Sequence, residues 1–175
     1  MKVNCFVVLI LGFFSVSVYS SEHLIGVDYK SINYEPIGFK DKISAIAINY
    51  ENNFSKYFSA EIYLGKGVET VSIYTELSEI EVEIEYLWGL DLKVQYPADD
   101  KFSMYAKIGY NEVRGKARAL SNGSGSSDTI SDPLYGVGSV YKINNRNQLY
   151  LEYTSYINDS NIKFDGFSIG YKYKI

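Results

Sequence analysis

The 175-residue sequence has one cysteine, one histidine, one tryptophan and three prolines. The cysteine, Cys5, lies in the apolar N-terminal segment, so the rest of the chain has no thiol for a disulfide, a metal site or a nucleophile. The formal net charge is −4 and the 17 bases are scattered, which excludes nucleic acid as a partner. Clustered cysteine and histidine ligands and a phosphate-binding glycine loop are also missing, so the sequence predicts no metal centre and no cofactor.

The N-terminus has the pattern of an export signal. Lys2 is followed by an apolar run from Cys5 to Phe14 and by small and β-branched residues up to Ser20. The run is roughly half of the ~20 residues that a membrane-spanning helix needs. We therefore predict a signal peptide over residues 1–20, cleaved after Ser20, and one domain over residues 21–175.

The aromatic content, 18 tyrosines and nine phenylalanines, favours β-structure. The clearest segment is 80–96, where apolar and aromatic residues alternate with charged or small ones. Because successive side chains of a strand point to opposite faces, Ile80, Val82 and Ile84 are expected on the apolar face and Glu81, Glu83 and Glu85 on the other. The same alternation predicts eight strands, near residues 24–33, 43–50, 57–65, 80–96, 102–110, 135–141, 149–153 and 167–175.

The connections alternate in length, which indicates a topology. Short turns follow the second, fourth and sixth strands, whereas longer polar links follow the others, including 70–79 and the longest, Arg114 to Pro133. The latter contains the serine- and glycine-rich segment Ser121 to Ser127 and is expected to be mobile. Short turns of outer-membrane barrels face the periplasm, so both termini are predicted on the periplasmic side of an all-β, eight-stranded antiparallel up-and-down transmembrane barrel.

The same periodicity also fits a soluble barrel, in which the apolar face of each strand points inward and the polar face contacts water. Other features of the sequence must therefore decide which face points outward. Small residues on the other face, such as Gly89, Gly109 and Gly138, suit a crowded interior. The apolar segment Phe102 to Tyr110 has nine residues, which is near the ~9 to 11 that cross the hydrocarbon. We therefore expect the apolar face to contact lipid.

The interior is then predicted to hold a network of paired charges. If Tyr96 pairs with Phe102 across the turn at Pro97, Asp91 lies opposite Lys107 and a cross-strand ion pair follows. The charged residues expected in the lumen are Asp28, Lys30, Glu61, Asp91, Lys93, Lys107, Glu152, Lys172 and Lys174.

Two charged groups lie beyond the apolar band. Arg114, Lys116 and Arg118 have lipid-side parity, and we hypothesise that they contact lipopolysaccharide phosphates. The acidic side chains at the start of the fourth strand could hold divalent cations, although a solvated acidic extension is the favoured interpretation. They are Glu76, Glu79, Glu81, Glu83 and Glu85.

No catalytic residue is predicted, because the sole histidine, His23, lies at the N-terminal end of the first strand and has no nucleophile to activate at the outer rim. The protein is therefore expected not to be an enzyme.

Five segments resemble the OmpA-like outer-membrane β-barrel family: 58–62, 86–90, 102–110, 135–138 and 151–154. The resemblance implies an eight-stranded barrel with a filled interior, located in the bacterial outer membrane and inserted by the outer-membrane assembly machinery. The sequence departs from the family pattern in two ways. No segment remains for a peptidoglycan-binding domain, and Ile175 stands where such barrels usually end in an aromatic residue.

Three functions follow from this interpretation. The first is a structural role in the envelope, carried by a monomeric barrel in contact with lipopolysaccharide. The second is an adhesin or receptor for a host factor, acting through the loops at 70–79 and 114–133. The third is a narrow pore for small ions, although eight strands leave an interior only wide enough for side chains.

Overall fold

The computed structural model describes residues 21–36, 41–74, 79–119, 125–158 and 162–175. In this part of the chain every regular element is a strand, and all neighbouring strands pair in antiparallel fashion. The strands are β1 (Glu22–Pro36), β2 (Asp41–Asn53), β3 (Phe58–Gly67), β4 (Thr70–Tyr74), β5 (Glu79–Pro97), β6 (Phe102–Ala119), β7 (Gly125–Lys142), β8 (Asn147–Asn158) and β9 (Ile162–Lys174).

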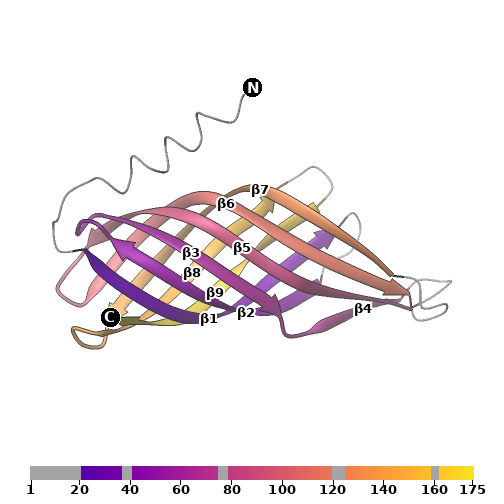
Figure 1. Cartoon of the computed structure of the whole chain (residues 1–175), viewed down its shortest axis with the longest axis horizontal. Helices are drawn as coiled ribbons and strands as arrows, with labels where there is room; N and C mark the ends of the chain where they lie inside the picture. The colour runs from indigo at the N-terminus through magenta and orange to yellow at the C-terminus, as the bar shows by residue number, and fades with distance from the viewer. Residues whose placement is uncertain (1–20, 37–40, 75–78, 120–124, 159–161) are drawn as a thin grey trace, which may run out of the picture.

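The sheet closes on itself because β1 pairs with β9 and β3 pairs with β5. The short strand β4 pairs with β5 beyond the end of β3, so β3 and β4 occupy one position in the wall. The predicted fold is thus confirmed: an eight-stranded antiparallel barrel, in which each strand neighbours the next along the chain (Figure 1). No described helix is long and apolar enough to cross a membrane.

The two ends of the barrel differ. Both termini of the described chain lie at one end, where the Ile175 amide donates to the His23 carbonyl oxygen at 2.9 Å. We call this the terminal end. At the opposite, extended end, β4, β5, β6 and β7 project beyond the other strands (Figure 1). The β6–β7 hairpin is paired out to Arg118 and Gly125, so the predicted loop Arg114 to Pro133 is mostly strand. Residues 120–124 of that loop lie outside the described part.

The loop predicted after the third strand also contains a strand, since β4 pairs Val71 with Val82 and Ile73 with Ile80. Both predictions were wrong for the same reason. Polar and serine-rich residues indicate solvent exposure, but a strand beyond the apolar band can be solvated and still make its backbone hydrogen bonds to a neighbour.

The expected polarity is present: apolar side chains point outward from the barrel. In the eight long strands, alternate residues of the apolar belt are exposed, for example Ile46 and Ile48 on β2 and Leu90, Leu92 and Val94 on β5. The residues between them are buried inside the barrel. An outward apolar belt of this kind is stable in lipid and not in water.

A β-bulge in β5 overturns part of the predicted facing. The register with β6 shifts by one between Ile84 and Tyr86, so Glu85 is an extra residue on β5. A one-residue insertion reverses the parity of every residue beyond it. Ile84 is consequently buried and Val82 packs against the core, whereas both were expected on the lipid face. A second bulge, between Ser155 and Ile157 on β8, places Tyr156 and Ile157 both inside.

Candidate functional site

Two features could carry function: the filled lumen, and the charged rim at the extended end. Eight of the nine charged residues predicted in the lumen are buried there, with Asp91 fully so, and the ninth, Lys174, is not. Glu51 joins them, although the sequence interpretation ended its strand at Tyr50. Extending the alternation of β2 by one residue would have found it, because Glu51 shares the inward parity of Asn49. The lumen network comprises Asp28, Lys30, Glu51, Glu61, Asp91, Lys93, Lys107, Glu152 and Lys172.

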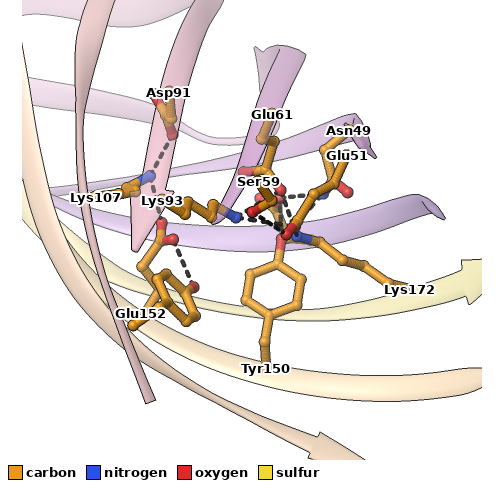
Figure 2. A network of polar contacts seen from close by, with 12 residues as sticks. Asn49, Glu51, Ser59, Glu61, Asp91, Lys93, Lys107, Tyr150, Glu152 and Lys172 are labelled. Carbon is orange, nitrogen blue, oxygen red and sulfur yellow. Dashed lines mark hydrogen bonds and ion pairs between the residues drawn. The ribbon is translucent and has the colours of Figure 1, made fainter. Parts of the chain in front are cut away.

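Each lysine of the network contacts at least one carboxylate, and Figure 2 shows the contacts of Lys93, Lys107 and Lys172. Lys107 bridges two of them, with its Nζ 2.8 Å from Asp91 Oδ2 and 2.8 Å from Glu152 Oε1. Lys93 and Lys172 share the carboxylates of Glu51 and Glu61. A charge out of water is tolerated when it is paired and hydrogen-bonded in this way.

The predicted register of the β5–β6 hairpin was wrong by two residues. Tyr96 pairs with Met104 rather than Phe102, and Asp91 therefore lies opposite Gly109. The turn is wider than expected because the amides of Lys101 and Phe102 both donate to Asp99 Oδ1, each at 2.7 Å. A register shift of two residues keeps each side chain on the same face of the sheet. Lys107 therefore still reaches Asp91, now as its diagonal neighbour across the two strands.

Lys174 was expected in the lumen and lies instead at the terminal end, half-exposed and paired with Glu22. His23 is also at this end, where its Nδ1 is 2.7 Å from the Tyr50 hydroxyl. Its Nε2 is 3.1 Å from the Ser21 hydroxyl oxygen, and this exposed pair lies at the terminal end and not at the extended end.

Three tyrosines of the lumen lie on glycines of the neighbouring strand. Tyr63 is paired with Gly89, Tyr105 with Gly138 and Tyr150 with Gly170. A Cβ on any of these glycines would collide with the tyrosine ring, so only glycine fits. Lysines of the network lie over the rings, with Lys30 Nζ 4.8 Å from the Tyr63 centroid and Lys172 Nζ 4.6 Å from that of Tyr150.

Toward the extended end the interior becomes apolar. The buried side chains there form a continuous cluster across all the strands that reach this level, with no charged member. We call this cluster the apolar layer: Ile32, Ile43, Ala45, Tyr63, Val71, Ile84, Leu87, Val113, Leu134, Tyr156, Ile157 and Phe164. The lumen is therefore filled by two layers, a charged one near the termini and an apolar one beyond it.

On the outside of the extended end, the bulge brings acids and bases together. Arg114 Nε is 2.8 Å from Glu85 Oε2, and Lys116 Nζ is 3.6 Å from Glu83 Oε1. Arg118 is the cross-strand partner of Glu81. These six residues form what we call the charged strip, which lies just beyond the apolar belt. Without Glu85 as the extra residue, the acids would point inward and the bases would face no partner.

The acidic cluster offers no cation site in the described part of the chain, where no three acidic, histidine or cysteine side chains are grouped to hold a metal. Glu81, Glu83 and Glu85 are separated along one strand face and lie beside bases instead. Glu76 lies outside the described residues.

The closed barrel with a lipid-compatible belt and a filled lumen defines the class of a bacterial outer-membrane β-barrel protein. The model of one family, the outer membrane protein beta-barrel domain, matches residues 6–174 of the chain. The protein belongs to this family and is located in the bacterial outer membrane.

Three solved structures illustrate the similarity. The attachment invasion locus protein Ail of Yersinia pestis has a TM-score of 0.68 at 13% identity, over 90% of this chain and 100% of Ail. Neisserial surface protein A has a TM-score of 0.66 at 13% identity, over 90% and 100%. OprG of Pseudomonas aeruginosa has a TM-score of 0.59 at 14% identity, over 89% and 95%. At these identities the likeness shows the fold alone. No protein with a curated description matches the sequence significantly.

Proposed function

We propose that the protein is a structural component of the outer membrane and catalyses no reaction. The observation that carries this proposal is the filled interior, where a paired charge network and an apolar layer occupy the barrel from one end toward the other. Such an interior stabilises a barrel wall. The protein acts as a monomer with lipid as its main partner, and the outer-membrane assembly machinery inserts it.

The test is the integrity of the envelope in cells that lack the protein. We expect increased leakage of a periplasmic enzyme and greater sensitivity to detergent. A variant without residues 116–127, in which Gly115 is joined to its cross-strand partner Asp128, should restore both. Unchanged integrity in the deletion strain would contradict the structural role.

The orientation and the export signal are part of the same proposal. Residues 1–20 are removed on export, and the terminal end faces the periplasm. The purified membrane protein should then begin at Ser21, and protease added to intact cells should cut only at the extended end. A cut within one of the tight turns of the terminal end, such as 98–101, would reverse the orientation.

A pore for small ions is the less favoured alternative. An ion would have to displace the ion pairs of the lumen network and then cross the apolar layer, which has no charged side chain to replace its hydration shell. We expect the protein to be silent in planar-bilayer recordings. Steady unitary conductance that disappears when Leu87→Trp narrows the layer would establish the pore instead.

The charged strip supports contact with lipopolysaccharide. It lies just beyond the apolar belt, where lipid phosphates lie, and the side chains of Arg114 and Lys116 are 44% and 42% exposed. An exposed guanidinium with one carboxylate partner retains donors for a phosphate. Replacing Arg114, Lys116 and Arg118 with glutamine should lower the amount of co-purified lipopolysaccharide, and replacing Glu81, Glu83 and Glu85 with glutamine should raise it. Equal amounts in both variants would remove the idea.

A second candidate function is the binding of a surface ligand through the extended end. The supporting observation is the edge of β7: residues 125–131 pair with β6 but have no strand partner on their other side in the described part of the chain. Such an edge can pair with an extended peptide. Ail, which has a similar fold, has been crystallised in complex with the heparin analogue sucrose octasulfate.

The variant without residues 116–127 separates the two functions. If the main role is structural, it restores envelope integrity and leaves cell attachment unchanged. If the extended end binds a ligand, it restores integrity but attachment falls.

A further inference from the structure

The three glycine-backed tyrosines of the lumen differ in one respect. The Tyr105 hydroxyl donates to Glu152 Oε2 at 2.7 Å, and the Tyr150 hydroxyl donates to Asp28 Oδ2 at 2.6 Å. The Tyr63 hydroxyl is equally buried but has no hydrogen-bond partner among the described residues. A buried hydroxyl without a partner is unfavourable, so a donor in this position needs an acceptor.

Two unpartnered acceptors lie beside it. Asn111 is the neighbour of Gly89 on β6, and Tyr63 is the neighbour of Gly89 on β3, so the two side chains flank the same glycine. The Asn111 amide nitrogen donates to the carbonyl oxygens of Asp132 and Tyr156, on β7 and β8. The amide oxygen therefore points the opposite way, back toward β5 and Tyr63, and has no partner in the described part of the chain.

The orientation of this amide is fixed by its contacts. If the nitrogen and oxygen were exchanged, the oxygen of Asn111 would face two carbonyl oxygens, which would repel it. The second acceptor is Asp91, two residues from Gly89 on β5. Its Oδ2 accepts from Lys107, whereas its Oδ1 has no hydrogen-bond partner among the described residues.

One donor and two acceptors thus lie at adjoining inward positions of β5 and β6, with the Tyr63 hydroxyl over Gly89 and Asp91 Oδ1 over Gly109. We propose that a single internal water molecule binds there, accepts from the Tyr63 hydroxyl and donates to Asn111 Oδ1 and Asp91 Oδ1. A water molecule can donate two hydrogen bonds and accept up to two, and about three partners are usual for a buried water. The ligand is neutral, because Lys30 and Lys107 already lie 4.8 and 5.7 Å from the Tyr63 ring centroid and would repel a cation.

The water has a defined place in the architecture. Tyr63 belongs to the apolar cluster, whereas Asp91 and its partner Lys107 belong to the lumen network. The water therefore links the two layers of the interior and completes the hydrogen bonds at their boundary, on three neighbouring strands of the wall.

The direct test is a crystal structure of the detergent-solubilised protein at a resolution that shows ordered waters, supported by water-to-hydroxyl cross-relaxation of Tyr63 in NMR spectra. We expect one water within hydrogen-bond distance of all three atoms. A direct hydrogen bond between Tyr63 and Asn111 with no water between them would overturn the proposal, as would a bound metal ion.

A stability measurement gives an independent test. If the Tyr63 hydroxyl binds the water, Tyr63→Phe should lower the ratio of folded to unfolded protein by about fivefold. If the hydroxyl has no partner, removing it should leave that ratio unchanged or raise it, which would overturn the proposal. Tyr105→Phe is the matched control, because its hydroxyl has a carboxylate acceptor and its loss should lower stability in either case.

Discussion

Lys107→Met removes the cation that holds two buried carboxylates in the lumen. The side chain of Lys107 is 1% exposed, and its ammonium group pairs with Asp91 and Glu152 at 2.8 Å each. Methionine has a similar length and preserves packing, so the change mainly deletes the charge. Glu152 keeps hydrogen bonds from Tyr105 and Thr154, but Asp91 loses the only one it has among the described residues.

Breaking a buried pair by removing one partner destabilises a protein by about 3 to 5 kcal/mol. We expect a loss of this size in the free energy of unfolding. The matched control is Lys116→Met, which removes a cation of the charged strip that is 42% exposed and 3.6 Å from its carboxylate partner. Exposed pairs contribute about 0 to 1 kcal/mol, so the control should be almost neutral.

The assay is urea-induced unfolding of the protein in lipid vesicles. Trp88, the only tryptophan, lies on the outer face of β5 and reports loss of the lipid environment through its fluorescence. The double variant Lys107→Met with Asp91→Asn should recover part of the loss, because the uncompensated charge is removed. If Lys107→Met is as stable as Lys116→Met, the lumen network does not stabilise the barrel in the way argued above.

Three further predictions concern the wall. Gly138→Ala should destabilise the barrel by about 1 to 3 kcal/mol, because a Cβ would lie 2.5 Å from the Tyr105 hydroxyl oxygen. Gly115→Ala should be neutral, because its Cβ would meet only the Glu83 carbonyl oxygen, at 3.9 Å. Equal unfolding midpoints of the two variants would refute the steric argument. Deleting Glu85 should remove the bulge and leave a barrel that still shows heat-modifiable gel mobility. Deleting Leu92, in the regular part of β5, should abolish that mobility. Loss of heat-modifiable mobility in both variants would contradict the assignment of Glu85 as the extra residue. Hydrogen bonds from the backbone amides of Lys101 and Phe102 lower the pKa of Asp99. These hydrogen bonds should therefore persist at a pH equal to the usual aspartate pKa of about 3.9 and break only as the pH falls through the lowered pKa. An NMR titration of the Asp99 carboxyl carbon that gives a pKa at or above the usual one would exclude them.

The sequence by itself determined the fold and the compartment. Strict alternation over nine residues in 102–110, interior glycines and aromatic residues at the strand ends permit one arrangement that is stable in lipid, a closed barrel with its apolar side outward. The lumen charges followed from the same parity, because a period of two assigns each residue to a face. The same parity also assigns Glu51 to the lumen. The sequence analysis missed it because the predicted second strand ended one residue earlier, at Tyr50.

Only the tertiary structure decided the register and the bulges. The width of the turn at Asp99 depends on side-chain hydrogen bonds, and it moved Asp91 from Lys107 to Gly109 as its cross-strand partner. The extra residue Glu85 looks like any other alternating position in the sequence, yet it reverses the facing of all that lies beyond it. The charged strip and the burial of Ile84 in the apolar layer both result from this insertion. Pairing with β6, and not local propensity, selects where a strand absorbs an extra residue.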